Sequence, residues 1–376
     1  MDFPFAFGKP VRGAHFINRK KELSKLRNNI DQNVHTIIIA PRRWGKTSLV
    51  KKLSRKLSKD KSLKFIYLDL FHISDEVEFY DTYCKEVLVA GSSKTDDIEN
   101  SARKFFKKTL PGIAFVNGPK HSIHMEMGQE DLEHYHHEVL ELPEKLAEKR
   151  EKKFIVCIDE YQTLFRFKNP ALFVSNLQAA WQRHKNVVYI LCGSKRHLMS
   201  ETFNDPGKPF FNFGEIMVLS NIKKKYFNQY IISTFERSGK TIPLDRANRI
   251  IELAERNPYF IQQLARSIWI KSAELVIDTD LEEAVKDLLL QNSIWYQREI
   301  ERMTPVQYNF LKAVVNREKN LSGQDVLRKY NLGSSAHVAK IKKVMEDREI
   351  LDFGNSYPEF TDPFFNLWIR KQEAPA

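Results

Sequence analysis

The sequence contains few cysteines and no long apolar run. Only three cysteines occur among 376 residues, and two of them, Cys157 and Cys192, lie inside apolar stretches. This pattern argues against a disulfide framework, so we expect reduced thiols in a hydrophobic core and a cytoplasmic location. No apolar run approaches the roughly 20 residues that cross a bilayer, so we expect no membrane partner. The opening MDFPFAFGKPVRG lacks the basic-then-apolar order of a secretory signal.

Acidic residues are scarce at the start of the chain. Residues 1–60 contain 15 Lys and Arg but four Asp and Glu, and so carry nearly all of the formal net charge of +12. A basic surface favours polyanions such as nucleic acid, because binding releases counterions. A solvated face beside a site for phosphate groups explains the excess equally well, and both interpretations stay open. The length predicts two or three domains.

Five short apolar runs, separated by helical stretches, predict strands of a parallel α/β sheet that is buried on both faces. About 80 residues separate the second run from the third, which indicates an insertion at about 72–128 followed by a helix at about 129–150. The five runs are Val34–Ala40, Leu63–Phe71, Lys152–Glu160, Asn186–Ser194 and Gly214–Ser220.

The chain becomes helical after the fifth run. Apolar residues at helical spacing follow Pro258, which predicts a small helical domain at 223–300 after an α/β core at 1–222. A third domain at 301–376 opens with Thr304 as a helix cap. It continues with a Ser-x-x-Asp cap signal at SGQD, a helix at about 335–348 and a hairpin in ILDFGNSYPEF. Two helices, a turn, a helix and a hairpin are the order of a winged helix.

The stretch IIIAPRRWGKTSLV lacks the first glycine of the phosphate-binding pattern G-x-x-x-x-G-K-[ST] but keeps the rest of it, between an expected strand and an expected helix. Gly45 leaves room for backbone N–H groups to approach phosphate oxygens. Lys46 is expected to bridge the β- and γ-phosphates, and Thr47 to hold Mg²⁺. The eight positions of the loop are Ala40, Pro41, Arg42, Arg43, Trp44, Gly45, Lys46 and Thr47.

The acidic partner of this loop is expected in FIVCIDEYQ. Asp159 ends an apolar strand, where it would hold Mg²⁺, and Glu160 would act as general base toward the attacking water. An Asn-Lys-x-Asp guanine motif is lacking, so the expected cofactors are ATP or ADP with Mg²⁺. The strand that ends in CGSKRHLM adds Ser194 and a cation, Lys195 or Arg196, that would sense the γ-phosphate. An ordinary helix cap with surface charges is the alternative.

These motifs resemble the archaeal-type ATPases of the STAND division of the AAA+ superfamily. FGKPVRGAHFINRKKEL is similar to the entry motif of that family, with Arg19, Glu22 and Leu23 at its Arg-x-x-Glu-Leu positions. APRRWGKTSL, LPEKLAEKREKKFIVCIDEYQTL, CGSKRHLM and FTDPFFNLWIRK resemble further blocks, so the similarity covers most of the chain. The resemblance implies nucleotide contacts from Arg19, from Ser48 after the loop, and from Pro258 on the adenine, and it makes the paired arginines of the loop ordinary variation.

Two departures from the family pattern are Ala40, in place of a glycine, and Arg256, which stands where related ATPases have glycine two residues before the proline. The winged helix would place His337, Lys340 and Lys343 on the outer face of its recognition helix. Residues 304–376 nevertheless hold 11 basic and nine acidic residues, a weak charge for tracking phosphates. In the resembling family such a domain often packs on the ATPase and holds it shut.

Five of the 11 histidines lie within a short span, but no cysteine or tight ligand spacing supports a zinc site there, so solvated histidines are expected. The five are His121, His124, His134, His136 and His137.

The sequence thus predicts a Mg²⁺-dependent ATPase switch, in which Glu160, Lys46 and Arg196 carry hydrolysis and ATP lies between the core and a helical lid. Its expected output is assembly with a protein partner, self-assembly, or binding of double-stranded DNA. Two alternatives stay open: a DNA-binding regulator that keeps ATP or ADP as a structural ligand, and a loader similar to replication initiators.

Overall fold

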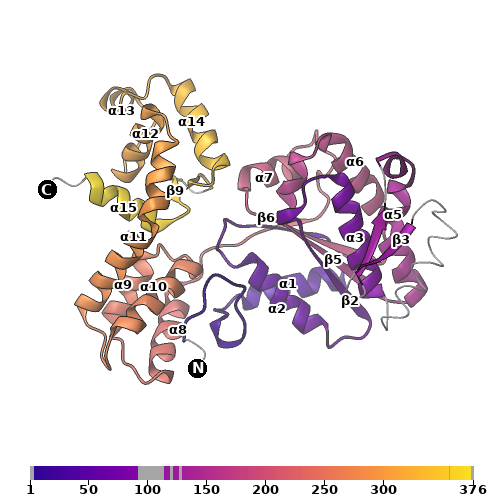
Figure 1. Cartoon of the computed structure of the whole chain (residues 1–376), viewed down its shortest axis with the longest axis horizontal. Coiled ribbons are helices and arrows are strands. Elements are labelled where there is room, and N and C mark those ends of the chain that lie inside the picture. The colour runs from indigo at the N-terminus through magenta and orange to yellow at the C-terminus, as the bar shows by residue number, and fades with distance from the viewer. Residues whose placement is uncertain (1–3, 92–113, 119–121, 127–128, 355, 374–376) are drawn as a thin grey trace. The chain divides into compact units, whose positions relative to one another are not determined.

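The computed structural model describes residues 4–91, 114–118, 122–126, 129–354 and 356–373, and it divides the chain into two units (Figure 1). The first, which we call the core unit, consists of Arg19–Ala40 and Lys46–Leu219. The second, which we call the C-terminal unit, consists of Met1–Asn18, Pro41–Gly45 and Ser220–Ala376. The middle of the phosphate loop is therefore grouped with the C-terminal unit, whereas its two ends belong to the core unit.

The core unit is built on a five-stranded parallel sheet with the strand order β2-β5-β6-β1-β7. The register pairs Asp69 at the end of β2 with Asp159 at the end of β5. The carboxyl ends of all five strands consequently meet at one edge of the sheet, where ligands bind in open α/β folds. The strands are β1 (Thr36–Ile39), β2 (Leu63–Asp69), β5 (Lys153–Asp159), β6 (Val187–Gly193) and β7 (Glu215–Val218).

The predicted α/β fold with a parallel sheet is confirmed, and each strand falls inside its predicted run. The prediction of burial on both faces is correct for the three inner strands, β5, β6 and β1. It is wrong for β2 and β7, where Asp69, Glu215 and Val218 are exposed. Both strands lie at an edge of the sheet, where helices leave part of the strand in contact with solvent.

Helices cover both faces of the sheet. Residues of α3, α5, α6 and α7 share one hydrophobic cluster with inward-facing strand residues such as Tyr189 and Phe154. Figure 1 shows α1 and α2 on the opposite face. The six helices are α1 (Lys20–Asp31), α2 (Lys46–Leu57), α3 (Glu76–Gly91), α5 (Gln129–Arg150), α6 (Pro170–Trp181) and α7 (Arg196–Asn204). All three cysteines are free and buried, as expected.

The region predicted as an insertion at 72–128 is partly integral to the core. Phe79, Tyr83 and Val87 of α3 are fully buried in the same cluster as the sheet. Strands β3 (Ala114–Gly118) and β4 (Ser122–Glu126) form a separate antiparallel pair. Of the clustered histidines, His121 lies outside the described residues. Among the residues that the structure does describe, no group of three or more His, Cys, Asp or Glu could hold a metal ion.

After Ser220, the C-terminal unit contains four helices that share a hydrophobic core. Helix α10 starts at Pro258 as predicted, with Asn257 as its cap, and buries Ile261, Leu264 and Ile268. No helix in the described part of the chain has the length and apolar character of a membrane span. The four helices are α8 (Lys224–Arg237), α9 (Leu244–Leu253), α10 (Pro258–Lys271) and α11 (Asp278–Glu301).

The predicted order of a winged helix follows. Thr304 caps its first helix with a capping box that includes Gln307, which confirms that prediction. The cap predicted at Ser322 is wrong: Gly323 is the N-cap residue, because the side chain of Asn320 accepts the Ser322 N–H at 3.3 Å and draws Ser322 into the preceding turn. The elements are α12 (Pro305–Val315), α13 (Gln324–Lys329), α14 (Ser335–Asp347), β8 (Leu351–Asp352), β9 (Glu359–Phe360) and α15 (Pro363–Glu373).

Candidate nucleotide site

The phosphate loop connects the end of β1 to the start of α2. Ala40, which replaces the usual first glycine, is fully buried, and its N–H donates to the Gly193 carbonyl at 3.3 Å. Its φ is not positive, so a side chain at this position adds no backbone strain. Gly45 has a φ of +89°, and a Cβ built there would meet nothing within 4 Å. The second glycine is thus required by conformation, whereas the first is not.

Lys46 lies folded back over the loop. Its Nζ donates to the Ala40 carbonyl oxygen at 3.2 Å and lies 3.9 Å from Glu160 Oε1. The side chain is only 5% exposed, so its charge is compensated by these oxygens and not by solvent. Such a buried ammonium group at the start of a helix is placed to attract a phosphate group.

Asp159 accepts hydrogen bonds from three donors at the carboxyl edge of the sheet. Its Oδ2 accepts the Thr47 hydroxyl at 2.7 Å and the Tyr67 hydroxyl at 2.8 Å, while Oδ1 accepts the Glu160 N–H at 3.1 Å. Only 2% of Asp159 is exposed. Burial, and then the charge of Asp159, raise the pKa of Tyr67, so this phenol stays a donor. The two predicted metal ligands, Thr47 and Asp159, are therefore brought together.

Tyr67 was missed by sequence reasoning. It lies on β2, where it is in register with Cys157 of β5. Cys157 precedes Asp159, whose carboxylate Tyr67 contacts, by two residues. The only sequence signal is its place near the end of a strand beside β5, and that neighbourhood depends on the strand order of the sheet.

Glu160 is held by two polar side chains. Its Oε2 accepts the Ser194 hydroxyl at 3.2 Å and also accepts Gln162 Nε2. Gln162 in turn donates to Ser194 Oγ at 3.0 Å and accepts the Ser194 N–H at 3.2 Å. Glu160 has a φ of 56°, in the left-handed region, which costs a non-glycine residue free energy. The sequence motifs give Gln162 no role of its own, and the structure makes it the orienting group of Glu160.

The structure also locates the other predicted residues of the core unit. Ser48 is buried in the first turn of α2. Arg196 is the first residue of α7, directly after Lys195, and both are half-buried. Arg19 precedes α1 in a left-handed conformation, is 5% exposed, and donates to Glu22 at 2.9 Å. Their contacts with a nucleotide stay predictions.

The loop arginines have partners inside the C-terminal unit, so they are more than the ordinary variation that the resemblance implies. Arg42 Nε lies 2.7 Å from Glu349 Oε2, and Arg43 Nη1 lies 3.4 Å from Asp362 Oδ2. The Arg43 guanidinium also lies 4.7 Å from the centroid of the Tyr259 ring, beside Pro258, the first residue of α10. Burial raises the pKa of Asp362 despite the nearby Arg43. Pro41 is buried and Trp44 is half-buried, while the predicted contact of Pro258 with adenine stays a prediction.

Solved structures similar to this chain share its fold. A Walker-type ATPase of Pyrococcus abyssi is 16% identical, with a TM-score of 0.69 over 98% of this chain and 99% of that one. The ADP form of the ORC2 protein of Aeropyrum pernix is 11% identical, with a TM-score of 0.54 over 98% and 97%. The ORC1 protein of Aeropyrum pernix in complex with DNA is 12% identical, with a TM-score of 0.51 over 97% and 94%. All three are below 25% identity, and these likenesses show a shared fold.

No curated protein matches the chain. Two family models do. The model described as "probable winged helix domain" matches residues 294–371, which agrees with α12 to α15. The model described as "ATPase domain predominantly from Archaea" matches residues 16–234, more than half of the chain, and these residues include the phosphate loop, Asp159 and Glu160. The chain therefore belongs to the family of ATPase domains found predominantly in Archaea.

Proposed function

We propose that this ATPase is a nucleotide-dependent switch of the STAND type, which binds ATP or ADP with Mg²⁺, hydrolyses ATP slowly, and passes its state to a partner protein or to DNA. The observation that carries the proposal is the junction at Asp159. There, the Thr47 hydroxyl contacts a buried carboxylate, and both Lys46 and an oriented Glu160 lie alongside. This is the set of groups that phosphoryl transfer to water requires.

The donor set suits Mg²⁺. A hydroxyl oxygen and a carboxylate oxygen 2.7 Å apart are hard ligands that need little rearrangement to share one small cation, whose remaining ligands would be phosphate oxygens and water. When bound, Mg²⁺ would offset the charge of the β- and γ-phosphates. Thr47 and Asp159 are the residues proposed to hold it, and the Tyr67 hydroxyl would keep the carboxylate of Asp159 in place.

In the proposed reaction, Lys46 exchanges its contact with the Ala40 carbonyl for the β- and γ-phosphate oxygens. Glu160 accepts a proton from the attacking water while Gln162 and Ser194 hold its carboxylate in one orientation. Arg196, or Lys195 beside it, would compensate charge on the γ-phosphate. The N–H groups of the loop and of the first turn of α2, including Ser48, would bind the remaining phosphate oxygens.

The contacts of Arg42 and Arg43 support a switch rather than continuous turnover. Two adjacent residues of the phosphate loop are paired with acids of the winged helix, Glu349 and Asp362. Any change in the loop that accompanies the nucleotide state would therefore alter ion pairs with the winged helix. This coupling is the feature that we assign to the STAND type, and it rests on two ion pairs and one aromatic contact.

The decisive experiment compares Glu160→Gln with Glu148→Gln, a matched change at an exposed glutamate of α5. Glu160→Gln should keep ATP affinity within about threefold and lower the turnover number by 10² or more, as loss of a general base does. Glu148→Gln should match the unaltered protein in both. Normal turnover in Glu160→Gln would remove the assigned base, and loss of ATP binding in that variant would assign it to binding instead.

Coupling to duplex DNA is a second candidate, because His337, Lys340 and Lys343 of α14 are all exposed. An exposed helix with cations along one face could enter a major groove. The test is steady-state ATP turnover with and without duplex DNA at low salt. Stimulation that is lost in Lys340→Gln would make DNA the partner, whereas turnover indifferent to DNA would favour a switch that awaits a protein.

A further inference from the structure

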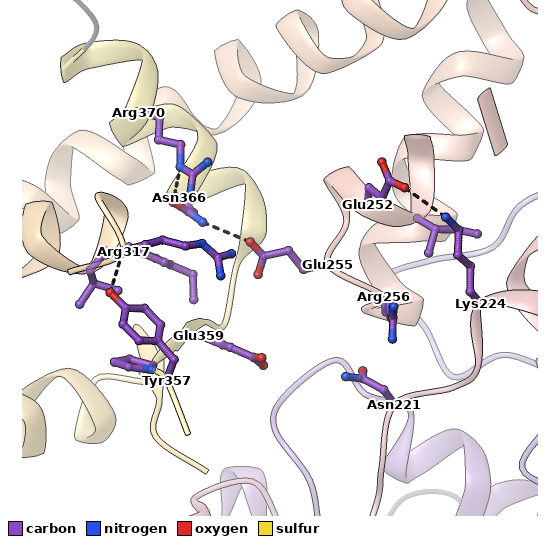
Figure 2. A pocket seen from close by; sticks show the side chains of 14 residues that line it. Asn221, Lys224, Glu252, Glu255, Arg256, Arg317, Tyr357, Glu359, Asn366 and Arg370 are labelled. Carbon is purple, nitrogen blue, oxygen red and sulfur yellow. Dashed lines mark hydrogen bonds and ion pairs between the residues drawn. The ribbon is translucent and has the colours of Figure 1, made fainter. Parts of the chain in front are cut away.

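The C-terminal unit contains a cavity that the proposed switch does not use. Its volume is about 370 Å³, within the usual range for small-molecule sites. All of its lining residues lie between Asn221 and Arg370, so none of them belongs to the phosphate loop or to the core unit. Figure 2 shows side chains entering it from the start of α8, the end of α9, the end of α12, the hairpin and α15.

Two arginines reach this cavity from unusual backbone positions. Arg256 follows the end of α9 with a φ of 57°, and Arg317 follows the end of α12 with a φ of 56°. Helices commonly end with glycine in this left-handed conformation, because any Cβ is strained there. Arg256 therefore adopts the backbone that glycine provides in related ATPases, and the geometry of the turn is kept. Carrying arginine at both sites costs free energy, and such strain often marks functional positions.

Their guanidinium groups are available to a ligand. Both residues are exposed, and neither takes part in an ion pair with any residue that the structure describes. The nearby Lys224 differs, because its Nζ lies 3.1 Å from Glu252 Oε1 and is neutralised by that contact. No ion pair in the described part of the chain therefore neutralises Arg256 or Arg317, and Glu255 offsets the charge of Arg317 only in part.

A third guanidinium is fixed in place by the cavity wall. Arg370 Nε donates to Asn366 Oδ1 at 3.2 Å, and its Nη2 donates to the Val315 carbonyl at 3.3 Å. A guanidinium has five N–H donors, so others remain for a ligand. Asn366 also donates to Glu255 Oε1 at 3.1 Å, which orders that carboxylate next to the arginine (Figure 2).

The acids of the cavity do not cancel this charge. Glu255 is half-buried, and burial followed by repulsion from Glu359 raises its pKa, which favours the uncharged form. Apart from the Lys224–Glu252 pair, three arginines face two glutamates. The Tyr357 ring completes the wall, with its hydroxyl donating to the Val314 carbonyl at 3.1 Å. The cavity therefore favours an anionic ligand with a polar, hydroxyl-bearing body.

We propose that this cavity binds a small phosphorylated molecule, whose phosphate groups are held by Arg317, Arg370 and Arg256. Planar guanidinium groups bind phosphate oxygens in pairs, which makes arginine better suited to this than lysine. Glu255 accepts a hydrogen bond from the body of the ligand. Because the wall combines residues of the helical region with residues of the winged helix, the bound molecule would tie α9 to α15.

The test is isothermal titration calorimetry of inorganic pyrophosphate into the full chain saturated with ADP and Mg²⁺, so that the phosphate loop is already filled. We expect a dissociation constant below about 1 mM, weakened tenfold or more in Arg317→Gln and in Arg370→Gln. Arg328→Gln, a matched change at an exposed arginine of α13, should bind as the unaltered protein does. Arg317→Lys keeps the charge but not the paired geometry, and should weaken binding by about threefold to tenfold.

The affinity for ADP, measured in the same variants, separates this proposal from the nucleotide site. It should stay within about twofold in Arg317→Gln. A change of tenfold would show that the cavity is part of the ATP site and would overturn the proposal. Absence of pyrophosphate binding, or equal binding in Arg317→Gln and Arg328→Gln, would overturn it as well. Ribose 5-phosphate tests the role of Glu255 toward the body of the ligand. Glu255→Gln should weaken the binding of ribose 5-phosphate but leave the binding of pyrophosphate unchanged.

Discussion

The charged side chains of the phosphate site in the core unit and those of the cavity in the C-terminal unit differ in burial and in ion pairing. In the core unit, Lys46, Asp159 and Glu160 are nearly buried and compensate one another through contacts with Thr47, Tyr67 and Gln162. In the C-terminal unit, the arginines of the cavity are exposed and lack described ion-pair partners, and the acids Asp362 and Glu255 have raised pKa values because of burial.

This difference separates two kinds of site. A preorganised set of mutually compensated groups suits chemistry, because little reorganisation is needed when charge develops. Cations without ion-pair partners around a cavity suit the binding of an anion, because the anion provides the negative charge that the surrounding residues do not. The family assignment agrees with the first description, since the model for an ATPase domain covers residues 16–234. The three arginines of the cavity, Arg256, Arg317 and Arg370, lie outside the residues that this model matches.

The largest expected effect comes from Lys46→Ala, which removes the central cation of the compensated set. We expect ATP and ADP affinity to fall by more than about 100-fold, because a buried cation that faces two phosphates is lost together with its contacts. Equilibrium dialysis with labelled ADP measures this. Lys59→Ala, at an exposed lysine just after α2, is the control and should change nothing. Nucleotide binding that survives in Lys46→Ala would place the site elsewhere.

Acid should destabilise the core unit before the C-terminal unit. Burial, with His184 nearby, lowers the pKa of His35 to about 4, so the folded core binds fewer protons than the unfolded chain, and stability is lost as the pH falls below about 6.5. Asp362 and Glu255 act in the opposite direction, because their raised pKa values favour the folded C-terminal unit as the pH falls. We expect the core to lose about 1–2 kcal/mol between pH 7 and pH 5.

Urea unfolding at the two pH values, followed by pulsed hydrogen exchange and mass spectrometry, resolves the two units. His35→Asn, which keeps an acceptor for the Tyr189 N–H, should reduce the pH dependence of the core. The part that remains is expected from His184, whose pKa burial also lowers. An equal loss of stability in both units would contradict the expectation that acid destabilises the core unit first.

Gln162→Ala tests how far the compensated set is preorganised. Without the amide, Glu160 keeps the Ser194 hydroxyl and its ion pair with Lys46, so we expect turnover to fall about tenfold, a part of the 10²–10⁴ that a general base contributes. ADP affinity should stay within about threefold, because Gln162 makes no contact with Lys46 or Thr47 among its described bonds. Loss of ADP affinity without loss of turnover would show that Gln162 supports the phosphate loop and not Glu160.

The smallest effect should follow from releasing the loop arginines. Combining Glu349→Gln with Asp362→Asn removes two acids that face Arg42 and Arg43, whose side chains are 47% and 45% exposed. Because the arginine of each pair is screened by solvent, each pair is expected to contribute about 1 kcal/mol, and we expect ATP turnover to rise by about threefold to fivefold. Asp325→Asn, an exposed acid of α13, is the control. Unchanged turnover would separate the winged helix from the proposed switch.

Local patterns account for much of the fold and of the site. β1, the phosphate loop and α2 follow from an apolar run, a turn with Gly45 and a basic amphipathic helix, all within about 20 residues. The same holds for β5 with Asp159 at its end, and for the capping box at Thr304. The prediction at Ser322 failed because the Asn320 side chain accepts the Ser322 N–H, and the helix begins one residue later with Gly323 as its N-cap.

What the sequence by itself determined is which residues form each element and which chemical groups lie at their ends, because hydrophobic periodicity and caps act over a few residues. Only the tertiary structure decided the strand order, and with it the contact of Tyr67 with Asp159, the hold of Gln162 and Ser194 on Glu160, and the meeting of Arg256, Arg317 and Arg370 around one cavity. These groups are as far as 114 positions apart, and their approach depends on the packing of whole elements, which no short stretch of sequence encodes.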